Sequence, residues 1–280
     1  MAEKSVKDRT ASIAVFCDFE NIAIGVRESR YDEFDISRVL ERLLLKGSIV
    51  VKKAYCDWER YKDFKKSMHE AAFELIEIPH VRQSGKNSAD IRMVVDALDL
   101  CYTKPHVNAF VVMSGDSDFS SLVTKLREND KMVIGVGVKN STSDLFTGAC
   151  DEFIFYDDLV REHEKRRKSR KRPPARAKST AAPAKGEAGA EERKQEAFDL
   201  VLDTIEMLWD ERGDEDDVWG SMVKQAIKRR KPGFNESYYG FRSFSELIKT
   251  MEKDGLLELE PDERSGGYII RDVHEADGAR

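Results

Sequence analysis

Residues 109–138, AFVVMSGDSDFSSLVTKLRENDKMVIGVGV, contain the clearest indication of the fold. Two apolar runs, 109–114 and 132–138, have the length and the Val and Ile content of buried β-strands. Between them, Gly115 permits a tight turn, and Ser117 is suited to cap a helix that begins at Asp118. The order strand, helix, strand favours two parallel strands joined by a right-handed crossover.

The same alternation extends over residues 11–160. Four further runs have the composition of strands: 11–17, 49–56, 72–78 and 153–156. Helical spacing recurs between them, at Ile36, Val39, Leu40, Leu43 and Leu44 and again at Ile91, Val94, Val95, Leu98 and Cys101. The unbroken apolar runs indicate a sheet that is covered on both faces. Residues 11–160 are therefore predicted to form an α/β domain, a parallel sheet with flanking helices.

A second folded unit is expected over residues 195–273. Helical patterns cover 198–209, 220–231 and 241–254, and Gly255 follows the third at a helix C-cap position. Two short runs, 256–260 and 268–272, flank a Ser-Gly-Gly turn and are typical of a β-hairpin. Three helices and a hairpin predict a small winged helix-turn-helix domain.

The segment between the two units is basic and poor in large apolar residues. Residues 164–178 include nine Lys and Arg, and we expect 161–194 to be a disordered basic linker. Such a run serves either as a solvated spacer or as a phosphate-binding arm. The net charge of the chain is −6, so binding of nucleic acid would depend on local basic patches.

The chain has no sequence feature typical of secretion or of a membrane. The first ten residues lack an apolar signal segment, and no apolar run is long enough to span a bilayer. The four cysteines are far apart and form no CxxC pair, which favours reduced core residues over disulfides or a zinc site. These observations predict a cytoplasmic protein with no membrane partner.

Three aspartates stand at positions that matter in an open parallel sheet. Asp18 directly follows the first strand, Asp116 follows the fourth, and Asp90 begins the helix expected over 88–102. Functional groups gather at the carboxyl ends of such strands. Two carboxylates 4 Å apart repel by about 4 kcal/mol at an effective dielectric of about 20, so a cluster needs a cation. An all-oxygen ligand set indicates Mg²⁺ or Mn²⁺.

Other polar residues beside this edge have two interpretations each. Asp118 either caps its helix or joins the metal ligands. Ser114 offers a hydroxyl to water or phosphate, and Asn21 offers an amide that would orient a carboxylate or water. On an ideal helical wheel Asp96 lies opposite the apolar stripe, which favours a solvated face. Lys86 either binds phosphate or is a plain loop lysine.

The motifs VFCDFEN, AYCDW, GKNSADIRMVVDAL, VVMSGDSDF and STSDLFTGACDEFIFYDDL, in this order, resemble the NYN domain family. The family is related to PIN-domain nucleases, and the resemblance covers about residues 11–160. It implies a PIN-like sheet and a carboxylate site that binds Mg²⁺ or Mn²⁺ and cuts RNA. The metal ligands it implies are Asp18, Asp90, Asp116 and Asp118, with Asn21 beside the first. The family pattern also has an aspartate at Asp96, against the helical-wheel argument.

The segment FNESYYGFRSFSELI resembles the LOTUS domain, also called OST-HTH. That resemblance implies RNA binding, with G-rich or G-quadruplex RNA reported for the family, or contact with a partner protein. The candidate RNA-binding residues are Lys224, Lys228, Arg229, Arg230, Lys231 and Tyr238. We expect Phe241 and Phe244 to be core residues. The helix-turn-helix plan by itself fits duplex DNA equally well.

Two hypotheses from different classes follow. In the first, the protein is a metal-dependent endoribonuclease whose catalytic residues are the four aspartates with Asn21, Ser114 and Asp96, and whose C-terminal module and linker hold single-stranded or structured RNA. In the second, it is a non-catalytic RNA-binding adaptor. A phosphotransfer enzyme of the Asp-x-Asp type is disfavoured, because Glu20 stands where the second aspartate would be.

Overall fold

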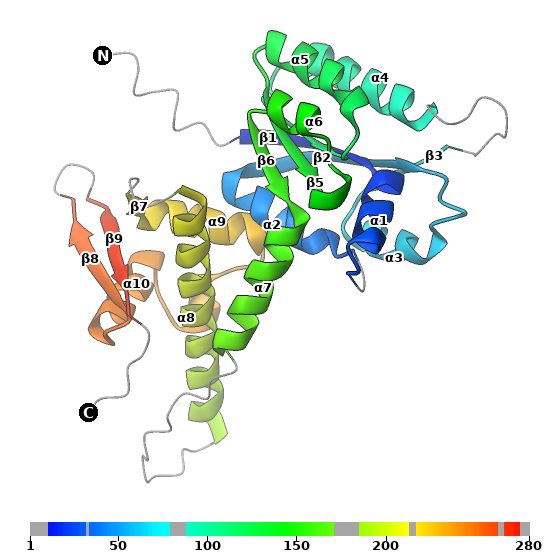
Figure 1. The fold of residues 1–280 in the computed structure, drawn as a ribbon. Coiled ribbons are helices and arrows are strands. Elements are labelled where there is room, and N and C mark those ends of the chain that lie inside the picture. Colours follow the sequence, from blue (N-terminus) through cyan, green and yellow to red (C-terminus); the bar gives the residue numbers. More distant parts are fainter. Residues whose placement is uncertain are drawn as a thin grey trace, which may run out of the picture. The chain divides into compact units, whose positions relative to one another are not determined.

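The computed structural model describes residues 11–31, 34–78, 88–170, 185–212, 217–262 and 266–274, except for the side chains of 165–170, 185–190 and 212. The chain divides into two compact units, Met1–Arg167 and Lys168–Arg280. Each is described by itself (Figure 1).

A six-stranded parallel sheet forms the centre of the first unit, with the strand order β3-β2-β1-β4-β5-β6. Its strands are β1 (Ala11–Asp18), β2 (Gly47–Cys56), β3 (Glu74–Glu77), β4 (Ala109–Met113), β5 (Met132–Gly137) and β6 (Glu152–Phe155). All five pairings between neighbours are parallel. The six predicted strands and the predicted α/β class are confirmed.

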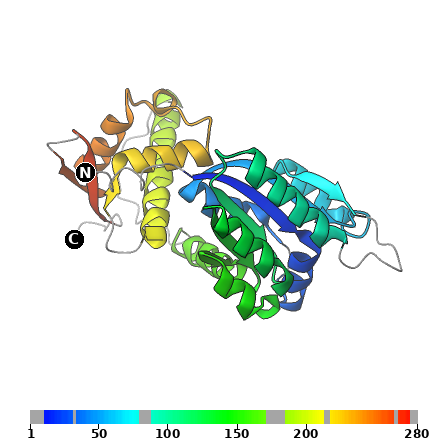
Figure 2. The same ribbon diagram turned by 90° about the horizontal axis from the view of Figure 1, so that it is seen from above.

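Helices cover both faces of this sheet (Figures 1 and 2). The helices are α1 (Phe19–Glu28), α2 (Ile36–Lys46), α3 (Lys62–Glu70), α4 (Ser88–Thr103), α5 (Ser120–Glu128), α6 (Asp144–Ala149) and α7 (Tyr156–Arg170), with 3-10 turns η2 (Ser117–Phe119) and η3 (Lys139–Ser141). Apolar residues of α1, α2, α3 and α7 pack on one face. Those of α4, α5 and α6 pack on the other.

Side-chain alternation along β1 explains why both faces are buried. Ile13, Val15 and Cys17 point into one core, while Ala14 and Phe16 point into the other, as the two-residue period of a strand requires. The cysteines are free, and all but the half-buried Cys150 are buried. Cys17, Cys56 and Cys101 are therefore core residues, as predicted.

The apolar stripe predicted for α4 is wrong at Ile91 and Val95, whereas Val94, Leu98 and Cys101 pack against the core as predicted. Its buried residues are Met93, Ala97 and Cys101, whereas Ile91 and Val95 are 63% and 55% exposed. Apolar residues occur around most of this helix, so their spacing alone did not identify the inward face. The correction matters for Asp96, which lies beside Ala97 on the covered side.

In its described residues, the second unit contains three α-helices, a 3-10 turn and a small antiparallel sheet. Its elements are α8 (Lys185–Arg212), β7 (Val218–Trp219), α9 (Gly220–Arg230), η4 (Glu236–Tyr239), α10 (Phe244–Lys253), β8 (Leu257–Pro261) and β9 (Tyr268–Val273). The sheet order is β7-β9-β8. Gly255 has φ +72, the left-handed conformation expected after a helix end. Phe241 and Phe244 are buried as expected.

The linker expected to be disordered over 161–194 is helical at both ends, because α7 continues to Arg170 and α8 begins at Lys185. The physical reason is that Lys, Arg, Glu and Ala are strong helix formers even where few apolar residues are available for a core. Residues 171–184 lie outside the described part of the chain. Within the described part, no helix is both long enough and apolar enough to span a bilayer.

Candidate active site

The predicted acidic residues lie where the order in which strands join the sheet reverses, between β1 and β4. β1 is followed by β2 and β3 on one side, and the chain then returns to add β4, β5 and β6 on the other. The carboxyl ends of β1 and β4 therefore lie side by side at a topological switch point, where open α/β sheets bind ligands. Asp18 ends β1 and Ser114 directly follows β4.

Asp18 is the most buried of these carboxylates, at 8% exposure. Its side chain caps α1 by accepting a hydrogen bond of 3.3 Å from the Asn21 backbone N–H, and it accepts a second of 3.0 Å from Ser114 Oγ. Burial, together with the charges of Asp90 and Glu20, outweighs these bonds and raises the pKa of Asp18 to about 7. The ionised form of Asp18 is thus less favourable in the folded protein than in the unfolded chain.

The turn after β4 is tied to the beginning of α1. The Gly115 N–H donates to Asn21 Oδ1 at 2.8 Å, and the Asp116 N–H donates to Ser114 Oγ at 3.2 Å. A Cβ atom at Gly115 would lie 2.0 Å from the carbonyl oxygen of Ser141, so only glycine fits here. Ser114 thus orients the Asp18 carboxylate, whereas the Asn21 amide oxygen accepts from the Gly115 backbone and contacts no carboxylate in these hydrogen bonds.

The helix after this turn begins later than predicted. Ser117 is not its cap: Asp116 accepts from the Asp118 N–H at 3.0 Å and caps the 3-10 turn η2, and α5 begins at Ser120. Asp118 is exposed and Asp116 half-buried. Because Asp116 takes the capping role, the Asp118 side chain does not cap this turn.

Asp90 joins this group from the first turn of α4. Burial raises its pKa to about 6, and the charges of Asp116, Asp118 and Glu20 contribute in the same direction. The structure therefore brings Asp18, Asp90, Asp116 and Asp118 within electrostatic reach of one another. It also adds Glu20, which was not among the predicted site residues and which stands at the second position of an Asp-x-Asp pattern.

The donor set at this edge fits a hard divalent cation. It consists of carboxylate, hydroxyl and amide oxygens, which Mg²⁺ and Mn²⁺ prefer. In the described residues, no three of the four aspartates bring carboxylate oxygens within 4.8 Å of one another. The three groups that do meet this spacing are Glu258, Asp272 and His274, which are exposed on the β8–β9 hairpin and were not predicted.

In the second unit, the structure separates the predicted RNA-binding residues into two groups. Arg230 is turned inward: its side chain is 9% exposed, donates to Thr204 Oγ1 at 2.9 Å and pairs with Asp203 at 3.2 Å. Lys224 pairs with Glu236 at 2.9 Å and is 38% exposed. Arg230 is thus occupied in holding α9 against α8.

Three of the remaining predicted residues of this unit, Lys228, Lys231 and Tyr238, are exposed to solvent. Arg229 is half-buried, and Tyr238 is 59% exposed. The Arg193 guanidinium lies 5.5 Å from the centre of the Tyr238 ring, which joins a cation to an aromatic face of the kind that stacks on bases. Lys86 lies outside the described residues.

Comparison with known families agrees with this geometry. The NYN domain model matches residues 12–157. The chain belongs to the NYN domain family. The OST-HTH/LOTUS domain model matches residues 198–268, so the resemblances found in the sequence are confirmed for both units. An NYN domain has a nuclease-type fold, and a LOTUS domain is an RNA-binding module.

Solved structures add little to the NYN assignment. A protein of unknown function from Vibrio parahaemolyticus is 26% identical, with a TM-score of 0.48, and the match covers 54% of this chain and 96% of that one. The Aeropyrum pernix Orc1 protein in complex with DNA is 14% identical, with a TM-score of 0.23, covering 94% and 83%. No curated protein matches the chain.

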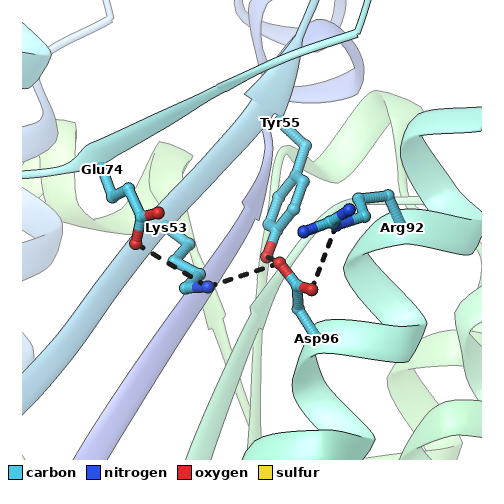
Figure 3. Close-up of polar contacts among 5 residues, drawn as sticks. All are labelled: Lys53, Tyr55, Glu74, Arg92 and Asp96. Carbon is cyan, nitrogen blue, oxygen red and sulfur yellow. Dashed lines mark hydrogen bonds and ion pairs between the residues drawn. The ribbon is translucent and has the colours of Figure 1, made fainter.

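Asp96 of the NYN domain contacts a phenol and two cationic side chains (Figure 3). Its side chain is 12% exposed and accepts from Tyr55 OH at 2.9 Å, from Lys53 Nζ at 3.3 Å and from Arg92 Nε at 3.1 Å. The expected solvated face is therefore wrong for Asp96, and its partners are cations and a phenol of β2 and α4. Tyr55 pairs in register with Asp18, so this contact fixes α4 next to the strand end.

Proposed function

We propose that this protein is a metal-dependent endoribonuclease whose NYN domain cuts RNA and whose LOTUS domain holds it. The observation that supports this best is the position of Asp18, buried beside Ser114 at the switch point of the sheet. Burial and neighbouring carboxylates raise the pKa of Asp18 to about 7 and that of Asp90 to about 6. Concentrated negative charge is costly unless a cation neutralises it, and it recurs where a fold binds a catalytic metal.

The residues of the chain have separable tasks in this proposal. Asp18, Asp90, Asp116 and Asp118 would hold the cation. When bound, Mg²⁺ or Mn²⁺ supplies a Lewis acid and a water of lowered pKa for attack on a phosphodiester. Ser114 keeps Asp18 in one rotamer through its hydrogen bond of 3.0 Å. Asn21 holds the Gly115 turn in place at 2.8 Å.

RNA binding by the second unit is assigned to its accessible residues. Lys228, Arg229 and Lys231 supply positive charge near the end of α9, and Tyr238 supplies an exposed ring. Tethering the two units raises the local concentration of RNA at the NYN domain. A cytoplasmic location forms part of this proposal, and four cysteines without disulfide partners fit it.

The test is cleavage of labelled single-stranded and structured RNAs with Mn²⁺, Mg²⁺ or EDTA. We compare the wild type with Asp116→Asn and with Asp99→Asn, an exposed control on α4. Metal-dependent cleavage by the wild type and the control, and its loss in Asp116→Asn, is the expected result. If no variant cuts any RNA while all of them bind it, the protein is an RNA-binding adaptor and the proposal is wrong.

A further inference from the structure

We call the group of Asp18, Glu20, Asp90, Asp116 and Asp118 the acidic edge of the NYN domain. An arginine that no sequence motif identified lies beside it. Arg60 lies in the turn after β2, and its Nη1 donates to Glu20 Oε1 at 3.2 Å. Glu20 is one of the charges that raise the pKa values of both Asp18 and Asp90. Arg60 therefore contacts a residue whose charge acts directly on the carboxylates of the proposed catalytic site.

The turn that bears Arg60 is held on both sides. Trp58 is 1% exposed, lies with its ring centre 5.0 Å from that of Phe19, and donates from Nε1 to the Ile76 carbonyl at 3.2 Å. Tyr61 packs edge-on against the same Phe19 ring at 5.7 Å. Because Phe19 directly follows the first aspartate, the base of the Arg60 side chain has a fixed position relative to the site.

Stability alone gives little reason for this arrangement. The Arg60 and Glu20 side chains are 51% and 37% exposed, and exposed ion pairs contribute only about 0.2–1 kcal/mol. A guanidinium has five N–H donors, and the hydrogen bond to Glu20 uses one nitrogen. The remaining donors match the geometry of a phosphate, which arginine binds through two parallel hydrogen bonds.

The electrostatics of the edge create a need for such a residue. Five acidic residues gather there: Asp18, Glu20, Asp90, Asp116 and Asp118. They repel a polyanion as well as attracting a metal ion, so an RNA strand needs a cation that binds its backbone nearby. A guanidinium oriented by Glu20 offers positive charge without entering the carboxylate cluster.

We propose that Arg60 binds a backbone phosphate of the RNA strand at the acidic edge and that Glu20 orients its guanidinium. This inference rests on the proposed function, because it names the substrate contact of the same site. Arg60 is a binding residue in this account. It aligns the strand and takes no part in bond breaking.

The experiment measures binding of a labelled single-stranded RNA to the full-length protein in EDTA, at several salt concentrations, so that no cleavage occurs. The variants are Arg60→Ala, Arg60→Lys and Arg127→Ala. Arg127 is a matched control: it is 49% exposed and pairs with Asp151 at 2.9 Å. Because Asp151 directly precedes β6, this pair lies at the opposite, amino-terminal edge of the sheet.

Arg60→Ala is expected to weaken RNA binding about tenfold and to reduce the slope of log affinity against log salt by about 0.7, the loss of one phosphate contact. Arg60→Lys should keep the slope, since it keeps the charge, and Arg127→Ala should change neither quantity. In cleavage assays with metal, Arg60→Ala should raise KM far more than it lowers kcat.

An affinity and a salt slope for Arg60→Ala equal to those of Arg127→Ala would overturn the inference, even if the wild type cuts RNA. Failure of the proposed function is a different result. It is an absence of cleavage by the wild type, and it leaves the binding measurement in EDTA to decide on Arg60 separately.

Discussion

Replacing Asp18 with asparagine is expected to stabilise the protein in EDTA while abolishing its RNA cleavage. Asparagine has nearly the same shape, and its amide oxygen can still accept the hydrogen bond from the Asn21 N–H that caps α1. Ser114 Oγ, which donates to the carboxylate at 3.0 Å, can rotate its proton and accept from the new amide instead. The substitution thus removes the charge and keeps the contacts.

The size of the effect follows from the raised pKa. The pKa of Asp18 goes from 3.8 to about 7 on folding, so the folded protein binds more protons than the unfolded chain between these values and its stability falls as the pH rises through them. At about 1.4 kcal/mol per pKa unit, folding with this group costs up to about 4 kcal/mol at pH 8, where it stays ionised, and about 2 kcal/mol at pH 5, where it takes up a proton. Asp18→Asn should recover much of this cost.

The assay is urea unfolding followed by circular dichroism at pH 5 and pH 8, in EDTA. Asp35→Asn is the control, because Asp35 also caps a helix, α2. Burial tends to raise the pKa of Asp35, but hydrogen bonds from Ser37 and Arg38 outweigh it and leave this pKa below its usual value. Loss of the Asp35 charge should therefore destabilise at pH 8.

The Asp18→Asn gain should be larger at pH 8 than at pH 5. A variant that is less stable than the wild type at pH 8, or a gain that does not depend on pH, would refute the view that Asp18 is a strained carboxylate.

Three further predictions test other parts of the structure. Gly115→Ala places a Cβ atom 2.0 Å from the Ser141 carbonyl oxygen and should destabilise the protein by about 1–3 kcal/mol, measured by urea unfolding. Asp96→Asn should lower the free energy of unfolding by about 1–3 kcal/mol. It should retain RNA cleavage, because the partners of Asp96 are Tyr55 and cations outside the acidic edge. Loss of cleavage in a folded variant would make Asp96 part of the site. Arg230→Met should lower the melting temperature and leave RNA affinity unchanged in a filter-binding assay, because its guanidinium is engaged inside the second unit.

The sheet and the positions of the strand-end aspartates could be predicted because both follow from local pattern. A buried parallel strand is a short continuous apolar run, and parallel pairing brings all carboxyl ends to one edge. The position of Asp18 next to Ser114 then needed only the assumption that their strands are neighbours. The pairing of β1 with β4 meets that assumption.

The orientation of α4 could not be predicted in the same way. Ile91 and Val95 satisfy the helical spacing as well as Met93 and Ala97 do, and only the tertiary packing decides which pair is buried. For this reason the helical wheel favours a solvated position for Asp96, whereas the family pattern places it in the site. Its hydrogen bond to Tyr55 stabilises a polar side chain on the covered face.

Ion pairs between distant segments were also out of reach of the sequence. Arg230 stands within the basic run KRRK, and nothing local distinguishes it from Arg229. Its inward position depends on Asp203, 27 residues earlier on α8. Arg60 and Glu20 are likewise 40 residues apart and meet only because β1 and β2 pair.

The acidic edge of the NYN domain is expected to bind a divalent metal. Calorimetric titration of Mn²⁺ into the purified protein measures this binding. Asp116→Asn removes one proposed ligand, and Glu258→Gln removes a carboxylate from the exposed group on the β8–β9 hairpin. We expect the wild type and Glu258→Gln to bind Mn²⁺ alike and Asp116→Asn to bind it at least about tenfold more weakly. Binding that survives Asp116→Asn but is lost in Glu258→Gln would contradict the account.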